Sequence, residues 1–349
     1  MRVPELLGHL ELQPFRERLP WRGADLQTLR DTLRPVRLPP DQGRPVELNA
    51  GRPPGVKAVP GPERLLALLD PPLGSTDPLA LVVLLHGLGG SSAREGLRRL
   101  GWALQAAGFA VLRLNLRGAD PGRNLAPGTY AANSNADLLP ALAQARQLAA
   151  GRPLLGAGLS LGGTQLLNAS LAAPGLLDGL ACISSPLDLG GCSAQIERPR
   201  NAVYQRWLLR RLVCQTLADP FGVGAEERQA LEAGSGPGTI RVFDAVITAP
   251  RWGYSSVAQY YAEASPLQRL LEPSRRTALP PTLLVQALDD PWVPAAATAQ
   301  VAATAAGCQL QVLLTRHGGH NGFHGVGDHP SGCWSDRVMA RWFHQLLTA

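Results

Sequence analysis

The chain has 349 residues, of which 45% are hydrophobic and 17% charged, so its composition is that of an ordinary globular protein. Its formal net charge of +6 and its pI near 9.4 come from arginines spread along the chain, with Lys57 as the single lysine. Because no basic run is interleaved with stacking aromatic residues, we expect no nucleic-acid partner, whereas peripheral contact with an anionic membrane surface is compatible with the charge.

The N-terminus and the cysteines indicate a cellular compartment. The first 20 residues lack the apolar core and small-residue cleavage site of a signal peptide. The longest apolar runs, such as residues 79–85, are far shorter than the roughly 20 residues that span a bilayer. An odd number of cysteines without a CxxC pair is typical of reduced thiols, so we expect a cytoplasmic protein. The cysteines are Cys182, Cys192, Cys214, Cys308 and Cys333.

Taken in chain order, the predicted elements fall into four parts. Residues 1–78 are rich in Pro and Gly and are predicted to be a lead-in with edge strands. In residues 79–186, short apolar runs alternate with amphipathic ones, which predicts strands buried on both faces of a parallel sheet. This rhythm breaks in residues 187–275 and returns in residues 276–349. The expected fold class is α/β, with a mostly parallel central sheet flanked by helices.

The segment 187–275 is predicted to be a helical insertion packed over the sheet, in the manner of a lid or cap. It contains a large share of the aromatic residues: Tyr204, Trp207, Phe221, Phe243, Trp252, Tyr254, Tyr260 and Tyr261. Such side chains can fix the insertion to the core, or they can line a pocket for an apolar acyl chain, and both roles can hold together. Trp207, Trp252 and Tyr260 are the candidates for the pocket.

The stretch RPLLGAGLSLGGTQLL, residues 152–167, passes from a strand pattern directly into a helix pattern. A dinucleotide fingerprint fails here, because Leu161 stands where the third glycine belongs, and no Gly-Lys-Ser/Thr of a phosphate loop follows. The pattern G-x-S-x-G from Gly158 to Gly162 does fit a nucleophile elbow, in which Ser160 is raised on a sharp turn. Ser160 is therefore the candidate nucleophile.

A serine nucleophile needs a base and an acid that orients the base, and in chain order the acid precedes the histidine. An apolar strand pattern ends at Asp289 and Asp290, and a later one ends in a glycine-rich loop with His317 and His320. The residues alone leave both choices open.

The oxyanion formed during acyl transfer needs two backbone donors. One is expected to be the amide of Leu161, directly after the nucleophile, and the other that of Leu88, in the HGLGGSS loop that follows an earlier strand.

Six stretches in this order resemble the YheT-type branch of the α/β-hydrolase superfamily, which is similar to ABHD-type lipases and phospholipases and to yeast medium-chain ethyl-ester synthases and esterases. They are HGLGGSS, LNLRGAD, GLSLGG, FDAVITAPRWGY with QYYAEASPL, ALDDPWVP and HGGHNGF. The resemblance implies an α/β-hydrolase fold, Ser160 as nucleophile, His320 as base and an aspartate of ALDDPWVP as acid, with Asp290 favoured over Asp289 by the usual position after the strand. It also implies a serine esterase without a cofactor, acting on esters of short to medium acyl chains, acylglycerols or other lipids. Asp25 stands where the family usually has His.

Four other functions are compatible with parts of the sequence. The cluster of His317, His320, His324, His329 and Asp328 could bind a metal, although it lacks an HExxH or CxxC context. An acyltransferase or a thioesterase would use the same triad, and a non-catalytic binding module could retain the scaffold. The binding module would be marked by loss of the Ser, acid or His, and all three are present.

Overall fold

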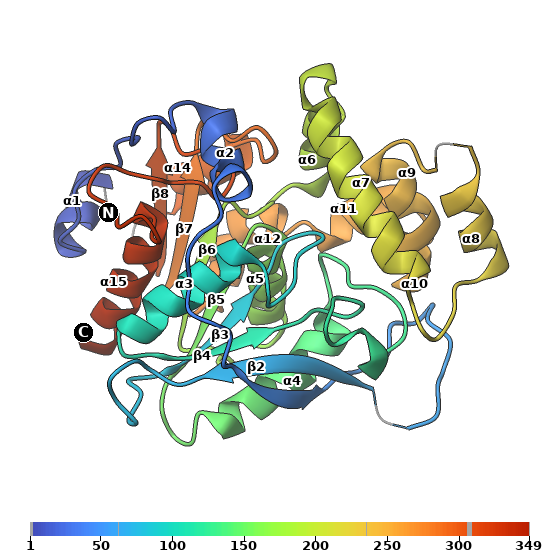
Figure 1. Ribbon diagram of the computed structural model, residues 1–349, viewed down its shortest axis with the longest axis horizontal. Coiled ribbons are helices and arrows are strands. Elements are labelled where there is room, and N and C mark those ends of the chain that lie inside the picture. Colours follow the sequence, from blue (N-terminus) through green and yellow to red (C-terminus); the bar gives the residue numbers. More distant parts are fainter. Residues whose placement is uncertain (1–2, 62, 235, 306–308, 349) are drawn as a thin grey trace.

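A computed structural model describes residues 3–61, 63–234, 236–305 and 309–348. These residues form one eight-stranded sheet with the order β1-β2-β4-β3-β5-β6-β7-β8 (Figure 1). The strands are β1 (Arg44–Asn49), β2 (Arg64–Asp70), β3 (Leu81–Leu85), β4 (Ala110–Leu114), β5 (Leu154–Leu159), β6 (Gly179–Ile183), β7 (Thr282–Ala287) and β8 (Leu310–Thr315).

Every strand pair from β4 to β8 is parallel, and only β1 with β2 and β2 with β4 are antiparallel. The mostly parallel α/β sheet predicted from the sequence is thereby confirmed. Because the carboxyl ends of the parallel strands meet at one edge, the loops after β3, β5, β7 and β8 come together there.

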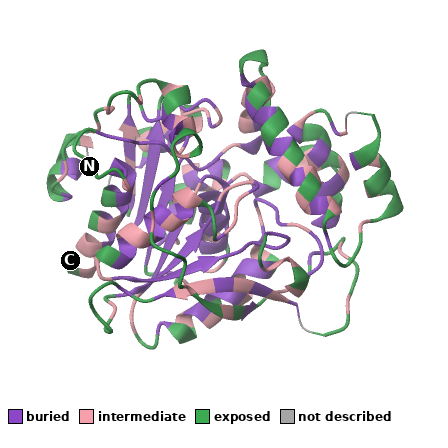
Figure 2. Ribbon diagram, viewed as in Figure 1, coloured by how far each residue is buried: buried purple, intermediate pink, exposed green. Residues whose placement is uncertain are grey.

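Helices cover both faces of the sheet, and successive residues of β3 show why its run is apolar throughout. Val83 belongs to the hydrophobic cluster on one face and Val82 and Leu84 to the cluster on the other, so the strand has no solvent side. Figure 2 shows the strands as buried between partly exposed helices. One face carries α1 (Val3–His9), α3 (Glu95–Ala106) and α15 (Trp334–Thr348); the other carries α4 (Asn135–Leu148), α5 (Leu161–Ala172), α12 (Leu267–Leu271) and α14 (Ala296–Thr304).

Most of the segment 187–275 is helical and has a hydrophobic cluster of its own. Leu208 and Leu212 of α7 pack there with Phe243 and Ile247. In Figure 1 these helices extend from one end of the sheet, at the upper right of the view. They are α6 (Leu189–Ile196), α7 (Ala202–Leu217), α8 (Ala225–Glu232), α9 (Ile240–Phe243), a π-helical turn (Asp244–Thr248), α10 (Ala249–Arg251) and α11 (Val257–Ala264). The segment also contains the 3-10 turn Pro199–Asn201, and α13 (Pro273–Arg276) lies at its end. Outside it lie α2 (Ala24–Leu33) and the 3-10 turn Arg123–Leu125.

Residues 1–78 contain the expected edge strands, β1 and β2, and also two helices, α1 and α2. The segment between these helices pairs with residues of the loop after β8. Arg18 donates its amide to the carbonyl of His324 at 3.1 Å, and Glu17 forms a bridge with Gly325. Residues close to the two termini therefore meet beside the loop after β8.

None of the helices in the described ranges is both long and apolar enough to cross a membrane. Four cysteines are free thiols, and Cys308 lies outside the described residues. The four are Cys182, Cys192, Cys214 and Cys333.

Candidate active site

Ser160 lies between the end of β5 and the start of α5, in a backbone conformation that non-glycine residues seldom adopt, with φ 52° and ψ −125°. Its two flanking glycines have no room for a side chain. A Cβ on Gly158 would lie 2.3 Å from the amide nitrogen of Gly163, and one on Gly162 would lie 2.6 Å from the carbonyl oxygen of Leu85. The glycines therefore let the strand, the helix and β3 approach closely enough to raise the serine.

The structure brings Ser160, His320 and Asp290 into one hydrogen-bonded line. The Nε2 atom of His320 lies 3.0 Å from Oγ of Ser160, and its Nδ1 lies 2.9 Å from Oδ2 of Asp290. All three residues are buried. Because the carboxylate can only accept, the Nδ1–H donates to Asp290 and Nε2 is left to accept the serine proton, which is the arrangement required of a general base.

The carboxylate of Asp290 is held by three further donors. Its Oδ1 accepts the amides of Trp292 at 2.8 Å and Val293 at 3.0 Å, and its Oδ2 accepts the side-chain amide of Gln286 at 3.1 Å. Three neutral donors stabilise the ionised form of a buried carboxylate and fix its direction. Asp290 is thus oriented toward His320 before any ligand binds.

Asp289 and His317, the two alternatives left open by the sequence, face each other instead. His317 is exposed, and its Nδ1 lies 3.3 Å from Oδ2 of Asp289. The other oxygen of Asp289 accepts the amide of Gly319 at 2.9 Å. This pair therefore braces the loop that carries His320, and no hydrogen bond among the described residues joins it to Ser160.

Two residues of α2 hold the same loop from the N-terminal side. The hydroxyl of Thr28 accepts the amide of His320 at 2.9 Å. The side chain of Gln27 accepts the amide of His324 at 2.7 Å and donates to the carbonyl of His324 at 3.1 Å. No sequence pattern marks these two residues, because they act through a contact between distant parts of the chain.

An indole covers one face of the candidate base. Trp292 stacks on His320 with ring centroids 4.4 Å apart and an interplanar angle of 26°. Tyr204 and Trp207 of α7 pack around Trp292, with centroids 5.3 and 6.4 Å away. The buried Nε1–H of Trp292 has no hydrogen-bond partner among the described residues. Trp292 belongs to the stretch ALDDPWVP, which stood out in the sequence for its aspartates, but nothing in that stretch predicts that its indole stacks on His320.

The loop after β3 packs directly against the candidate nucleophile. A Cβ on Gly87 would lie 2.9 Å from the Cβ of Ser160, so this position too requires glycine. His86 anchors the loop: its Nδ1 lies 2.8 Å from the carbonyl of Gly87, and its Nε2 accepts the amide of Leu116 at 3.2 Å. Complete burial lowers the pKa of His86 to about 4, so the imidazole is neutral at pH 7.

The predicted oxyanion donors, Leu88 and Leu161, line the same small cavity. Leu161 is the first residue of α5, where amide groups lack intrahelical acceptors and the positive end of the helix dipole lies. Among the hydrogen bonds of the described residues, none uses the amide of Leu88 or Leu161. Both positions are therefore suited to receive a developing negative charge.

This cavity has a volume of about 30 Å³, which is room for a water molecule or two. Tyr260 is one of its lining residues. Trp252 and Trp207 are not: the indole of Trp252 donates to the carbonyl of Thr129 at 2.8 Å, and Trp207 is exposed. Of the three aromatic residues proposed for an acyl pocket, only Tyr260 borders this cavity, while Trp252 fixes the helical segment to the core.

The histidine-rich C-terminal cluster is dispersed among separate partners. His324 lies 3.4 Å from Asp31, and burial with the nearby charge of Arg99 lowers its pKa to about 3. His329 accepts the amide of Ser331. In the described ranges, the one group with ligand atoms mutually within 4.8 Å is Glu17, Asp289 and His317, which is not the cluster expected from the sequence.

Comparison with known proteins identifies the family. Residues 76–325 match the hydrolase family model described as serine aminopeptidase, S33. The chain is 28% identical over 272 residues to the putative esterase YheT of Escherichia coli (strain K12), covering 77% of each chain. It is also 28% identical over 272 residues to phospholipase ABHD3 of Mus musculus, covering 76% of this chain and 64% of the phospholipase. The chain therefore spans somewhat under two thirds of that relative.

Solved structures support the same fold. The structure of a soluble variant of monoglyceride lipase from Saccharomyces cerevisiae superposes with a TM-score of 0.52 at 15% identity, covering 86% of this chain and 98% of that one. The turn at Ser160, the order of the strands and the family match all indicate an α/β hydrolase. The chain belongs to the α/β-hydrolase family of serine hydrolases whose model bears the description serine aminopeptidase, S33.

Proposed function

We propose that this protein is a carboxylic ester hydrolase that works through an acyl-serine intermediate. The observation that carries the proposal is the buried hydrogen-bonded line from Ser160 through His320 to Asp290. The family includes relatives named as esterase and phospholipase, which supports an ester as the substrate class.

In the proposed mechanism, Nε2 of His320 accepts the hydroxyl proton while Oγ of Ser160 attacks the ester carbonyl. Asp290 accepts from Nδ1–H and stabilises the imidazolium that forms. His320 then gives its proton to the leaving alcohol, and water repeats the cycle on the acyl-serine. The amides of Leu88 and Leu161 stabilise the oxyanion in both halves of the reaction.

The acyl group is proposed to be short or medium in length. The cavity beside Leu88 and Leu161 is apolar on several sides but holds only about 30 Å³, so an acyl chain requires the side chains of Phe243 and Tyr260 to move or the chain to leave along the surface. An acyltransferase or thioesterase shares the acyl-serine step and differs in the acceptor or leaving group that the site admits.

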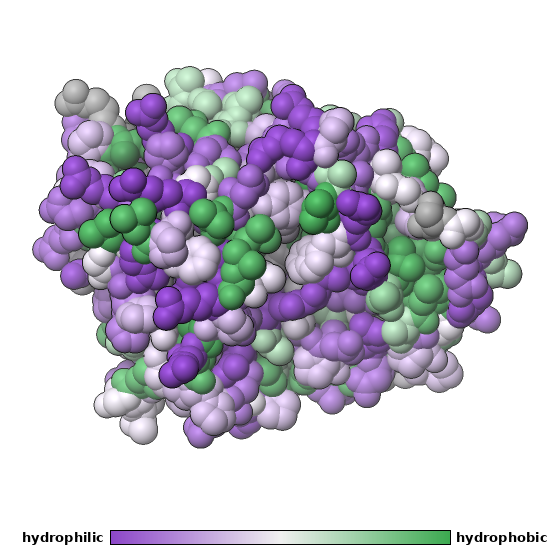
Figure 3. Space-filling view, turned by 45° about the horizontal axis from the view of Figure 1, so that its top comes forward, coloured by the Kyte–Doolittle hydropathy of each residue, from purple (hydrophilic) through white to green (hydrophobic). Residues whose placement is uncertain are grey.

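The proposed cellular setting is the cytoplasm, with peripheral membrane contact as a further prediction. Figure 3 shows hydrophobic residues scattered among hydrophilic ones on one face, with a larger group at the end that carries the segment 187–275. Exposed apolar side chains of that segment are Val203, Trp207, Phe221 and Val242. These residues are the proposed surface for such contact.

The function is tested by intact mass after exposure to a fluorophosphonate probe. One adduct is expected on the parent protein and on the control Ser170→Ala, because Ser170 is a buried serine of the adjoining helix whose hydroxyl has no described partner. No adduct is expected on Ser160→Ala. A folded parent that takes up no probe would contradict the proposal and favour a non-catalytic binding module.

Ester, thioester and glyceride panels, each with and without an added alcohol acceptor, then separate hydrolysis from acyl transfer. Release of free acid from esters at a rate unaffected by alcohol is the expected result.

A further inference from the structure

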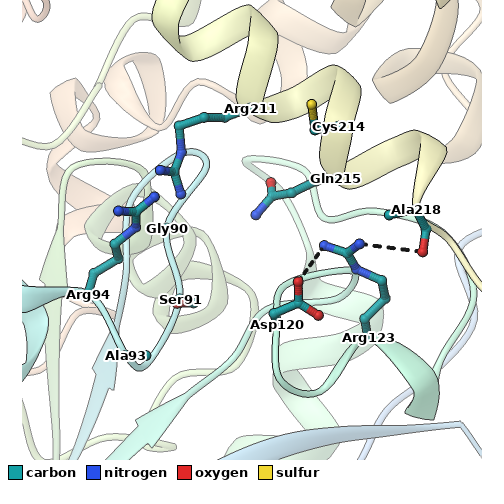
Figure 4. A pocket seen from close by; sticks show the side chains of 10 residues that line it. All are labelled: Gly90, Ser91, Ala93, Arg94, Asp120, Arg123, Arg211, Cys214, Gln215 and Ala218. Carbon is teal, nitrogen blue, oxygen red and sulfur yellow. Dashed lines mark hydrogen bonds and ion pairs between the residues drawn. The ribbon is translucent and has the colours of Figure 1, made fainter.

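An open pocket with a volume of about 520 Å³ lies between the loop after β3 and helix α7. Its charged lining residues are Arg94, Arg123, Arg211 and Asp120, so its formal charge is positive, with three cations against one anion. Figure 4 shows the guanidinium groups of Arg94 and Arg211 on one side, and Arg123 with Asp120 on the other, with the amide of Gln215 directed between them.

The positive charge is only partly neutralised by the protein. Arg123 pairs with Asp120 at 2.9 Å, but its buried Nε has no described partner. Arg211 donates to the carbonyl of Gly89 and stacks over Trp207, with no described carboxylate within ion-pair distance. The guanidinium of Arg94 has neither a hydrogen bond nor an ion pair with any other described side chain. Guanidinium groups gathered around one cavity without matching carboxylates form a site for an oxyanion.

This pocket adjoins the candidate active site through two connections. The first is the loop itself: Gly87 packs on Ser160, and the amide of Gly90, a lining residue, donates to the carbonyl of Gly87 at 3.0 Å. The second is Gln215, which lines both this pocket and the small cavity that contains Leu88 and Leu161.

Aromatic contacts also lead from one of these arginines, Arg211, to the proposed base. Arg211 lies over the ring of Trp207 at 5.0 Å, Trp207 packs on Trp292, and Trp292 stacks on His320. The arginine pocket and the surroundings of Ser160 are therefore neighbours that share the loop after β3 and the side chain of Gln215.

We infer that the arginine pocket binds the phosphate group of a phosphorylated ester whose carbonyl is attacked by Ser160. This inference rests on the proposed ester hydrolysis and names its substrate class. A phosphate monoester carries a charge of about −1.5 to −2 at pH 7, which matches the excess of two positive charges in the pocket. Its three terminal oxygens can accept from Arg94, Arg211 and Gln215 together, which a single carboxylate does less well.

The test compares monooctanoylglycerol with its phosphate monoester, octanoylglycerol phosphate, as substrates of the full chain. For the parent protein we expect kcat/KM to be at least about tenfold higher for the phosphorylated ester, the effect of one charge-assisted hydrogen bond. Arg94→Gln is expected to remove most of this preference by raising KM for the phosphorylated ester, and the readout is the ratio of kcat/KM for the phosphorylated ester to kcat/KM for the neutral ester in each variant. Arg94 is suited to this test because its side chain forms no described hydrogen bond that folding requires.

Arg210→Gln is the matched control. Like Arg94→Gln, it removes one positive charge, but from an exposed side chain of α7 that lies outside the pocket, next to Arg211 in the sequence. The preference for the phosphorylated ester is therefore expected to persist. Arg123→Gln is a second pocket variant, expected to act like Arg94→Gln. Circular dichroism of each variant establishes that it is folded.

Inorganic phosphate distinguishes a substrate group from a free ligand. It is expected to inhibit the parent competitively toward the phosphorylated ester, and more weakly in Arg94→Gln. Equal kcat/KM for the two esters in an active parent would overturn the inference while leaving ester hydrolysis intact. This holds even if inorganic phosphate binds through Arg94, because the pocket would then be a site for free phosphate and not for a substrate group. An absence of fluorophosphonate labelling and of turnover on either ester would overturn the proposed function itself.

Discussion

The indole of Trp292 lies flat on the imidazole of His320, with ring centroids 4.4 Å apart, and it follows the proposed acid, Asp290, by two residues. Trp292 thus contributes twice to the site: its amide orients the carboxylate at 2.8 Å, and its ring limits the positions open to the base.

The first prediction concerns this ring. Trp292→Ala is expected to lower kcat about tenfold or more with a small change in KM, because a loosened imidazole spends less time in line with Ser160. Trp292→Phe keeps an aromatic face and is expected to recover most of the loss. Steady-state kinetics on a neutral octanoyl ester provide the measurement, and equal losses in both variants would show that the aromatic stack is not what matters.

The second prediction separates the two neighbouring aspartates. Asp290→Asn is expected to lower kcat by about 10⁴, as for the equivalent change in a serine protease, because the amide no longer fixes the productive tautomer. Asp289→Asn is expected to cost less than about tenfold, since Asp289 only braces the loop through Gly319 and His317. The reverse order of the two effects would reassign the acid.

The third prediction concerns the elbow glycines. Gly158→Ala places a Cβ 2.3 Å from the backbone nitrogen of Gly163, so the strand and helix must separate. We expect a loss of roughly 1–3 kcal/mol in the free energy of unfolding, together with reduced labelling of Ser160. Gly190→Ala in α6 serves as the control, because its Cβ would meet nothing closer than 3.5 Å. Urea denaturation of both variants measures the difference, and similar stabilities would argue against a close approach at Gly158.

The fourth prediction follows from the buried His86. Burial lowers its pKa from 6.5 to about 4 in the folded protein, so between these values the unfolded chain binds a proton that the folded one does not. The free energy of unfolding should therefore fall as the pH is lowered from 7, by about 2 kcal/mol at pH 5 from this residue. His324, with a pKa near 3, acts in the same direction, whereas Asp244, with a pKa raised to about 6 by burial, acts in the opposite one.

Urea midpoints at pH 7 and pH 5 measure this effect, with His86→Gln for comparison. The variant is expected to be less stable at pH 7, because Gln does not place an acceptor where Nε2 of His86 accepts the amide of Leu116. Its free energy of unfolding is expected to fall less than that of the parent between pH 7 and pH 5. An unchanged decline would assign the acid sensitivity to other groups.

Much of the fold was predictable because it depends on local patterns. The uniformly apolar run of β3 reports burial on both faces, and the glycines around Ser160 report a turn with no space for side chains. The order of a serine, an acid and a histidine follows from the way parallel strands present their ends, whereas the preference for Asp290 and His320 over Asp289 and His317 came from the family resemblance.

The remaining features arise from contacts between distant residues. Nothing in the sequence near Thr28 indicates that its hydroxyl accepts the amide of His320, and nothing near Arg94 indicates that it shares a pocket with Arg211. The aromatic residues of the helical segment illustrate the same limit. The sequence shows that they are concentrated there, but only the packing shows that Trp252 donates a hydrogen bond to the carbonyl of Thr129 while Tyr260 lines the cavity.

The contact of α2 with the base loop also has a consequence for biosynthesis. Thr28 and His320 are separated by 292 positions, and Gln27 and His324 by 297. Contacts of such long range form late, since most of the chain must first be ordered between them. On a ribosome, Thr28 emerges 292 residues before His320, so α2 lacks its partner loop over that length of translation. Strands β7 and β8 also lie between Ser160 and His320 in the chain, so hydrolytic competence is expected only after both the sheet and the contact with α2 have formed.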